Sequence, residues 1–205
     1  MGYNFTRGID NQDYERCVFM KLLIASDIHG SLSAARNVVE VFEKENANYL
    51  VLLGDLMYHG PRNSLPYEYN PAGVAQLLNT VKDKVIAVRG NCDSEVDQML
   101  FDFPITAEYQ NIPLQRGKLF ATHGHIYDPT PNLTELPKSI SSGDIFAFGH
   151  VHLPILEMNT AGILVLNPGS AALPKEDHPP TYATIDNDKV EIKTFDGDVY
   201  REFLR

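Results

Sequence analysis

The sequence predicts an α/β fold that begins with parallel strands and ends with antiparallel ones. The first observation is the order of elements: apolar runs at residues 22–25, 49–53 and 84–88 alternate with segments of helical periodicity, which is typical of parallel crossovers. The second is a change after Pro104, where short apolar segments follow one another with only turns between them. At 205 residues the chain can bury a full core, and we expect one domain.

The first strand, residues 22–25, is uniformly apolar, as expected of a strand covered on both faces. Beyond it come Asp27, Ile28 and His29. Alternate residues of an extended chain point to the same side, so we expect Asp27 and His29 to converge while Ile28 returns to the core. A carboxylate and an imidazole at one point can form half of a divalent-metal site, although an isolated Asp-x-His triplet is more often an ordinary polar strand end.

A helix is predicted after this turn, with Ser31 or Ser33 as its N-cap, because apolar residues recur at every third or fourth position. The second strand, residues 49–53, ends in Gly54 and Asp55. Adjacent parallel strands place Asp55 at the same edge as the polar end of the first strand. This is the edge at which open α/β sheets bind ligands.

The middle of the chain is predicted to contain a long loop, a helix, a strand and a second helix, at residues 56–70, 71–81, 84–88 and 94–100. The loop is long enough to have a function of its own. The strand ends in Asn91, Cys92 and Asp93, and we expect Asp93 to cap the helix that begins near Ser94.

The second half is predicted to be mainly β-structure. Its predicted strands span residues 106–112, 118–122, 145–148, 155–158, 163–166, 182–186, 190–195 and 199–203. His123 follows the second of these strands, and His150 and His152 follow the third. The turn Asn167-Pro168-Gly169-Ser170 is interpreted as structural.

Composition argues against two function classes. The formal net charge is −10, and the 17 Lys and Arg residues form no dense cluster, which argues against a nucleic-acid surface. No apolar run approaches the about 20 residues that span a membrane. With two cysteines and no recognisable secretory signal, we expect a cytoplasmic protein. Residues 1–19 show no periodicity and are interpreted as an N-terminal extension or tag before a domain at residues 20–205.

Five strand ends therefore carry polar side chains beside glycine, and seven of these side chains can offer oxygen or nitrogen to a metal. They are Asp27, His29, Asp55, Asn91, His123, His150 and His152. Seven donors exceed the four that a tetrahedral zinc needs, and one bridging carboxylate would give each of two ions four bonds. Two ions about 3.5–4 Å apart are a recurrent arrangement for phosphate-ester hydrolysis. One histidine is usually a core residue, but four at such strand ends indicate a site.

Taken in order, the same motifs resemble those of the calcineurin-like metallophosphoesterases. The family pattern is Asp-x-His, Gly-Asp, Gly-Asn-His-Asp/Glu, a lone His and Gly-His-x-His. The chain has Asp27-Ile28-His29, Gly54-Asp55, Gly90-Asn91-Cys92-Asp93, His123 and Gly149-His150-Val151-His152. The match runs from Leu22 to Ser170, and the small size and the Gly-Pro-Arg-Asn loop at residues 60–63 resemble the bacterial YfcE-like phosphodiesterase branch.

This resemblance implies a four-layer α/β/β/α sandwich of two mixed sheets. It also implies a phosphodiesterase that hydrolyses small phosphate esters by attack of a hydroxide bridging two divalent ions. One ion would be held by Asp27, His29, Asp55 and His152, and the other by Asp55, Asn91, His123 and His150. Mn²⁺ suits this mixture of carboxylate, amide and imidazole ligands, with Zn²⁺, Fe²⁺ and Ni²⁺ as alternatives.

One residue departs from the family pattern, because Cys92 stands where most members have a histidine that assists the leaving group. Asn91 and Cys92 are thus the candidate catalytic residues. A thiol is a weak hydrogen-bond donor, so we expect Cys92 to act more as a filler than as an acid. Arg62 is either a phosphate-binding residue or an exposed loop charge. His125 is expected either to contact the substrate phosphate or to support a metal ligand, rather than to bind a metal itself.

Two rival functions stay open. A nuclease of the same superfamily would need a basic groove or an added domain, and neither is visible. A protein-interaction scaffold, like the metallophosphoesterase-like subunit of retromer, should have lost ligands that this chain keeps. We expect a small phosphodiester as substrate and no nucleic-acid or membrane partner, and we leave a homo-oligomer open.

Overall fold

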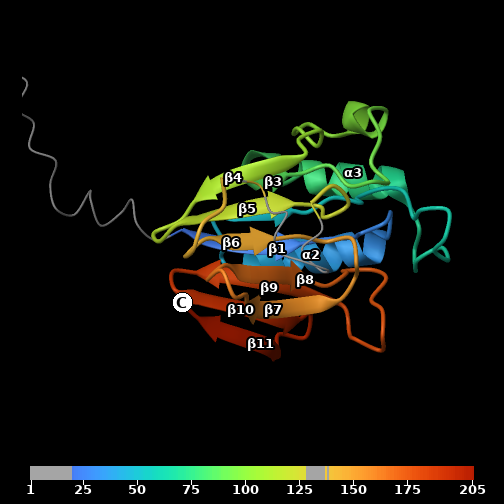
Figure 1. Ribbon diagram of the computed structural model, residues 1–205. Coiled ribbons are helices and arrows are strands. Elements are labelled where there is room, and N and C mark those ends of the chain that lie inside the picture. The colour runs from blue at the N-terminus through green and yellow to red at the C-terminus, as the bar shows by residue number, and fades with distance from the viewer. Residues whose placement is uncertain (1–19, 128–136, 138) are drawn as a thin grey trace, which may run out of the picture.

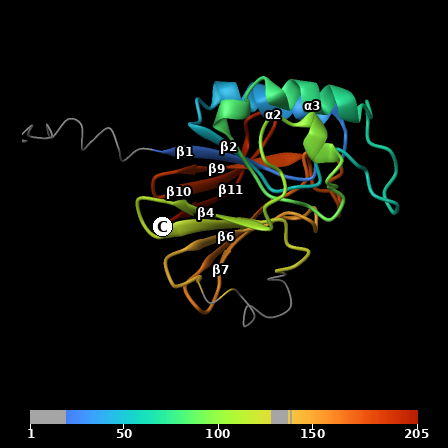
Figure 2. The ribbon, with the colours of Figure 1, turned by 90° about the horizontal axis from the view of Figure 1, so that it is seen from above.

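The computed structural model describes residues 20–127, 137 and 139–205. Within these ranges the chain forms two mixed β-sheets that pack face to face, with helices over the outer face of one sheet (Figures 1 and 2). The α/β class with two mixed sheets is confirmed. The predicted N-terminal extension, residues 1–19, lies outside the described residues. Within the described ranges, no helix is both long and apolar enough to cross a membrane.

The helical elements are α2 (Leu32–Lys44), α3 (Pro71–Asn79) and the 3₁₀ turns η1 (Lys82–Lys84) and η2 (Asp97–Leu100). α2 begins where its cap predicts, because the Ser31 hydroxyl accepts a hydrogen bond from the Ala34 N–H. The Asn70 side chain caps α3 in the same way by accepting from the Gly73 N–H. The α-helix predicted at residues 94–100 is wrong, since only the short η2 forms there.

The first sheet has the strand order β11-β10-β9-β1-β2-β3. Its strands are β1 (Lys21–Ala25), β2 (Tyr49–Leu52), β3 (Val85–Ala87), β9 (Thr181–Asp186), β10 (Lys189–Thr194) and β11 (Val199–Leu204). β1, β2 and β3 are parallel, and Leu23 lies opposite Leu50. β9 pairs antiparallel to β1, with Thr184 on the other side of Leu23. The last strands of the chain therefore extend the sheet that the first strands begin.

The second sheet has the order β4-β5-β6-β8-β7. Its strands are β4 (Tyr109–Pro113), β5 (Lys118–Thr122), β6 (Ile145–Ala147), β7 (Pro154–Met158) and β8 (Leu164–Pro168). β5, β6 and β8 are parallel, while β4 and β7 run antiparallel at the edges. The strands predicted at residues 155–158 and 163–166 are β7 and β8, which pair antiparallel.

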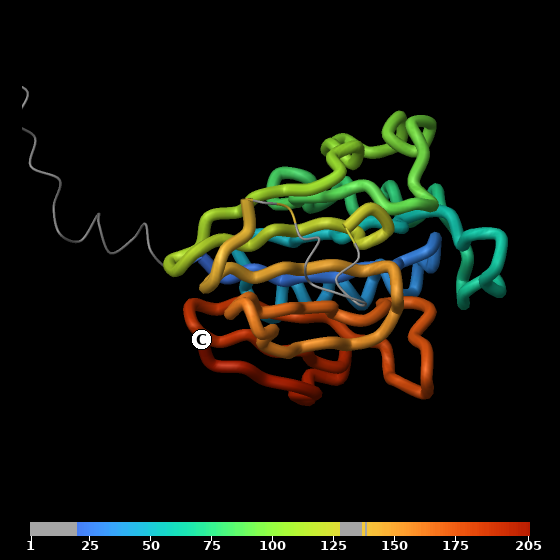
Figure 3. The backbone as a smooth tube through the Cα atoms, in the orientation of Figure 1, coloured from blue at the N-terminus to red at the C-terminus, as the bar shows by residue number. Residues whose placement is uncertain are grey.

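The layers follow from the alternation of side chains along the strands. In β1, Leu23 and Ala25 pack under α2 and α3, whereas Leu22 and Ile24 fill the space between the sheets. This double coverage explains why β1 is apolar at consecutive positions. The outer face of the second sheet carries an aromatic cluster, and the Phe120 ring stacks on the Tyr109 ring at 5.0 Å. Figure 3 traces the chain through both sheets to the loops at one end of the sandwich.

Candidate metal centre

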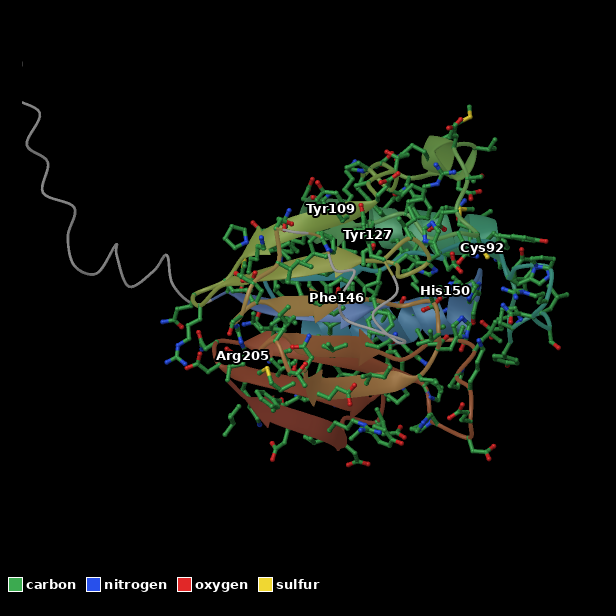
Figure 4. The ribbon with its side chains drawn as sticks, viewed as in Figure 1. Cys92, Tyr109, Tyr127, Phe146, His150 and Arg205 are labelled. Atoms are coloured by element: carbon green, nitrogen blue, oxygen red, sulfur yellow. The ribbon has the colours of Figure 1, made fainter. Side chains whose placement is uncertain are left out.

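Polar residues gather at one end of the sandwich, where β1, β2, β3, β5 and β6 end. Figure 4 labels Cys92 and His150 at this end and Arg205 at the opposite end. Two groups of buried side chains direct possible ligand atoms at one another there. They are Asp27, His29 and His152 in one group and Asp27, Asp55 and His123 in the other. The edge predicted from parallel strand order is therefore where the structure brings these residues together.

The imidazole Nε2 atoms face the two carboxylates at distances slightly longer than hydrogen bonds. Asp27 Oδ1 lies 3.3 Å from Nε2 of His152 and 3.6 Å from Nε2 of His29. Asp55 Oδ2 lies 3.4 Å from Nε2 of His123 and 3.7 Å from Nε2 of His29. The carboxylate Oδ1 of Asp27 is buried and has no hydrogen-bond partner among the described residues.

The other ring nitrogen of each of these histidines has a fixed role. Nδ1 of His29 lies 2.8 Å from the Tyr58 carbonyl, and Nδ1 of His152 lies 2.6 Å from the Leu173 carbonyl. In His123, Nδ1 lies 2.6 Å from a main-chain carbonyl oxygen directly after the end of β2. A carbonyl oxygen can only accept, so Nδ1 carries the proton and the neutral ring presents a lone pair at Nε2. Metal-binding histidines are held in this way.

Asn91 and His150 complete the predicted set at the more open side of the site. Asn91 is exposed, and its Oδ1 lies 3.1 Å from Nε2 of His123. The His150 ring is half-buried and packs edge-on against the His123 ring at 5.1 Å between centroids. The His150 main-chain N–H donates to Asp27 Oδ2 at 3.1 Å. All seven residues predicted as ligands therefore lie within this one cluster.

The backbone conformation that places these side chains cannot be recognised from the strand pattern. Positive φ values between 50° and 67° occur at Asp27, His29, Asp55, His150 and His152. Non-glycine residues rarely adopt this conformation, and such strain tends to occur at functional sites. Asp27 and His29 do converge and Ile28 is fully buried, as predicted. The predicted reason, alternation along an extended strand, is wrong, because both residues lie in a turn beyond β1.

Asp93 has a role different from the predicted helix cap. Its buried carboxylate accepts hydrogen bonds from the main-chain N–H groups of Gly90, Asp55 and Leu56, each at 2.8 Å. These bonds tie the chain after β3 to the chain after β2. A Cβ on Gly90 would lie 2.1 Å from Asp55 Oδ1, so this close approach requires glycine. The prediction of a cap is wrong because the α-helix it would cap does not form.

Serine and asparagine residues hold the loop after β1 from the other side. The Ser26 hydroxyl donates to Asp27 Oδ2 at 2.6 Å, and the Ser170 hydroxyl donates to the Asp27 carbonyl at 2.9 Å. The Asn167 carboxamide donates to the Gly149 carbonyl at 2.8 Å. The turn at residues 167–170 thus contacts the polar ends of both β1 and β6. These bonds support its interpretation as a structural element.

The electrostatics of the metal-free cluster are dominated by burial and by the Asp–His contacts. Burial raises the pKa of Asp27, but the nearby His152 and His29 rings outweigh it and hold this pKa well below the usual value. Burial likewise lowers the pKa of His123, yet contact with Asp55 and Asp27 raises it to about 9. The pKa of Asp55 is lowered by His123 in spite of burial. The buried carboxylates are therefore stabilised by nearby positive charge, which protons on the histidine rings supply when no metal is bound.

The cluster opens into a cavity of about 320 Å³. Its lining consists of His29, Asp55, Gly60, Pro61, Arg62, Asn63, Asn91, Cys92, His150, His152 and Lys175. Arg62 was predicted from sequence, whereas Lys175 was not. The sequence feature that could have indicated Lys175 is its position a few residues after the turn at Asn167. That turn contacts the same strand ends. His125 lies beside His123, with 5.4 Å between ring centroids, but does not line this cavity.

Cys92 lies on the cavity wall and is half-buried. Its Sγ accepts a hydrogen bond from the Asn91 carboxamide at 3.2 Å. Burial and the neighbouring Asp55 carboxylate raise the pKa of the Cys92 thiol to about 12, so the thiol is protonated at neutral pH in the metal-free cluster. A Cβ on Gly60 would lie 3.1 Å from this sulfur, which shows how closely the loop after β2 packs on it.

Comparisons with known proteins agree with the motifs. The model of the calcineurin-like phosphoesterase superfamily domain matches residues 20–190. Phosphodiesterase YfcE of Escherichia coli K12 is 51% identical over 173 residues, which cover 84% of this chain and 91% of that protein. The solved structure of the E. coli phosphoesterase YfcE has a TM-score of 0.85 at 47% identity and covers 90% of this chain and 99% of that one.

A solved Vps29 from Entamoeba histolytica has a TM-score of 0.60 at 20% identity, covering 91% of this chain and 99% of that one, which shows a shared fold alone. The metallophosphoesterase match implies divalent metal ions, and the Asp and His groups described above supply candidate ligands. The resemblance predicted from the motifs is confirmed. The chain therefore belongs to the calcineurin-like phosphoesterase superfamily and is a hydrolase of phosphoric esters.

Proposed function

We propose that the protein is a phosphodiesterase that binds two divalent metal ions and hydrolyses small phosphodiesters. One observation carries this proposal. Three imidazoles are fixed by Nδ1–H bonds to carbonyls, and their Nε2 atoms face the carboxylates of Asp27 and Asp55. Such a set of oxygen and nitrogen donors fits divalent transition-metal ions, and Mn²⁺ is the ion we propose first.

The ligands divide into two groups that share one carboxylate. The first ion would be held by Asp27, His29, Asp55 and His152, and the second by Asp55, Asn91, His123 and His150. When bound, two such ions supply an activated water nucleophile near neutral pH and neutralise charge on the phosphate oxygens. Asp55 would be the ligand shared by the two ions, a role supported by the position of its Oδ2 near both His29 and His123.

The residues of the chain itself position the substrate. Arg62 lines the cavity, and its guanidinium can pair with two non-bridging oxygens of the scissile phosphate. The exposed His125, whose ring lies 5.4 Å from that of His123 and 6.4 Å from that of His150, would contact the phosphate from beside the cavity lining. Asn91 orients the reacting phosphate together with its role as ligand. Cys92 fills the wall beneath Gly60 without donating a proton to the leaving group.

The cavity supports a small substrate. Its volume of about 320 Å³ is at the lower end of the range for small-molecule sites, about 300–1,000 Å³. The cavity is lined by one Arg and one Lys, which do not make the extended basic groove that a nucleic acid requires. The relative phosphodiesterase YfcE carries the same activity in its name.

Metal removal and reconstitution test the proposal. Protein dialysed against a chelator should lose turnover of an aryl phosphodiester, and Mn²⁺ should restore it with two equivalents bound per chain by elemental analysis. Turnover should also fall as the pH drops below about 6.5, since the imidazole ligands must be neutral to bind metal. Full activity after exhaustive chelation would refute the metal mechanism, and a single equivalent at full activity would refute the second ion.

A further inference from the structure

We propose that Lys175 is a specificity-determining residue that binds a second anionic group of the substrate, apart from the scissile phosphate. This inference rests on the proposed phosphodiesterase function and names the substrate class more closely. The substrate would be a phosphodiester in which one of the two alcohols carries a phosphate, phosphonate or similar dianion. Lys175 enters the cavity from a loop between β8 and β9 that no motif singles out.

The loop that carries Lys175 is tied directly to the metal centre. The Lys175 N–H donates to the His152 carbonyl at 3.4 Å, and the His152 ring donates to the carbonyl of Leu173 at 2.6 Å. The Ser170 hydroxyl, which donates to the Asp27 carbonyl, accepts from the Leu173 N–H at 2.8 Å. The main chain of Lys175 therefore holds a defined position relative to two predicted ligands.

The same loop is held on its far side and contains strained backbone. Glu176 and Asp177 have φ values of 53° and 59°, a conformation unusual for two consecutive non-glycine residues. The turn is closed by the His178 N–H, which donates to the Lys175 carbonyl at 3.1 Å. The His178 ring contacts the Tyr200 hydroxyl on β11 at 2.7 Å. A surface connection needs no such strain, whereas strain of this kind often occurs at ligand-binding sites.

The two cations that line the cavity are unpaired among the described residues. Neither Arg62 nor Lys175 has a described carboxylate within the 4.0 Å of an ion pair, although Lys21, Lys82 and Lys193 all do. Arg62 comes from the loop after β2 and Lys175 from the loop after β8, so they reach the cavity on separate segments. Both cations are therefore available to an anionic ligand in the cavity, and Lys175 offers a second contact beside Arg62.

The net charge of the metal-loaded site supports this role for Lys175. Two divalent ions with Asp27, Asp55 and the adjacent buried Asp93 leave about +1, and Arg62 and Lys175 raise the site to about +3. A nucleophilic hydroxide and a phosphodiester each bring −1, which leaves about +1. A further anionic group on the substrate offsets this remainder, and Lys175, which lines the cavity, is the residue assigned to receive it. A diester with two uncharged alcohols leaves the excess charge in place.

Matched substrates separate this role from general charge effects. We would compare 4-nitrophenyl propyl phosphate with 4-nitrophenyl 3-phosphonopropyl phosphate, which share the leaving group and differ only in the distal dianion. For the Mn²⁺-loaded protein, Lys175→Ala should raise KM for the phosphonopropyl ester about tenfold, because a hydrogen bond to a charged group is lost. Both kcat values and the KM of the propyl ester should stay within about twofold. Lys175→Arg should restore most of the affinity, and Lys175→Glu should weaken it further.

A matched control and a binding measurement keep the test decisive. Lys44, an exposed lysine at the distal end of α2, should tolerate Lys44→Ala with no change for either ester. Calorimetry with the propyl and 3-phosphonopropyl monoesters of 4-nitrobenzylphosphonate, in which CH₂ replaces the leaving-group oxygen and the central −1 charge is kept, should show the same tenfold, salt-sensitive loss for Lys175→Ala on the analogue with the distal dianion alone. Equal binding of that analogue by wild type and Lys175→Ala would overturn the Lys175 proposal while leaving the diesterase proposal intact. If wild type hydrolysed neither ester, the diesterase proposal would fail, and calorimetry would still decide the role of Lys175.

Discussion

Nε2 of His29 lies 3.1 Å from Nε2 of His152, and each of these rings already donates its Nδ1 proton to a main-chain carbonyl. In the neutral rings, two lone pairs therefore face each other inside a buried cluster. This contact is repulsive unless a proton or another cation lies between the two nitrogens. Burial and the Asp27 carboxylate act in opposite directions on the pKa of His29, and the carboxylate prevails and raises it. The cluster is built to hold positive charge.

A first prediction concerns Asp55, the one carboxylate proposed to contact both ions. Asp55→Asn keeps the shape of the side chain but removes its negative charge. We expect the variant to lose at least one metal equivalent and at least about 100-fold in turnover. The reason is that the two cations then share a neutral amide in place of a negatively charged carboxylate. Elemental analysis of the purified variant measures the first effect directly. Two full equivalents with normal turnover would exclude the bridging role.

The second prediction concerns the dependence of stability on pH. In the metal-free protein the pKa of His123 is about 9, above the 6.5 of the unfolded chain. The resulting stabilisation is complete below pH 6.5 and is lost as the pH rises through 9, an effect on the order of 3 kcal/mol. The Tm of metal-free protein should therefore fall by roughly 6–12 °C between these pH values. Differential scanning fluorimetry measures it.

The control for this prediction is His123→Gln, which removes the titrating ring. Its Tm should change much less over the same range, so the comparison subtracts the general effect of raising the negative charge of an acidic chain. Added Mn²⁺ should act in the opposite sense, since neutral rings bind metal better, and its stabilising effect should grow from pH 6.5 to 9. A metal-free Tm that is independent of pH, or identical slopes for both proteins, would contradict the assigned pKa.

A third prediction concerns Cys92 and the leaving group. If the thiol is a filler, hydrolysis should depend steeply on the pKa of the departing alcohol, and Cys92→Ala should change aryl-ester turnover less than about twofold. General acid catalysis is worth about 10²–10⁴-fold, so its presence or absence is easily measured. Cys92→His should help poor leaving groups most, provided that the loop at Gly60 moves to admit the ring. A flat wild-type dependence that becomes steep in Cys92→Ala would identify the thiol as the working acid.

The fourth prediction concerns Asp93, which binds no substrate in this proposal. Asp93→Ala leaves three main-chain N–H groups without their acceptor and should lower the free energy of unfolding by about 3 kcal/mol or more. Asp93→Asn keeps one acceptor oxygen and should cost about half as much. Both should also weaken metal binding, because the Asp55 backbone moves. Urea denaturation measures stability, with Asp196→Ala, at an exposed position, as the control; equal stability of all three variants would contradict the assignment.

Local sequence patterns were sufficient to predict most strands and their polar ends. Apolar runs such as residues 22–25 are local signals, since a strand covered on both faces excludes polar residues along its length. Parallel order then places the ends of neighbouring strands at one edge, which is why Asp27, His29 and Asp55 could be grouped before their positions were known. The assignment of these residues as metal ligands stays a prediction until the metals are measured.

The way in which those residues face one another depends on tertiary contacts that no local pattern predicts. The left-handed backbone at Asp27 and His29 depends on hydrogen bonds to the chain after β2, and the Asp93 carboxylate depends on the same segment. The helix predicted after Asp93 was wrong, since only η2 forms there and the Gln98 side chain bonds main-chain groups of the residues that follow instead of facing solvent on a helix. Lys175 reaches the cavity through a contact with His152, which is distant in sequence. Contacts of this kind join segments that leave no common local pattern, so their energies exist only once the sheets have packed.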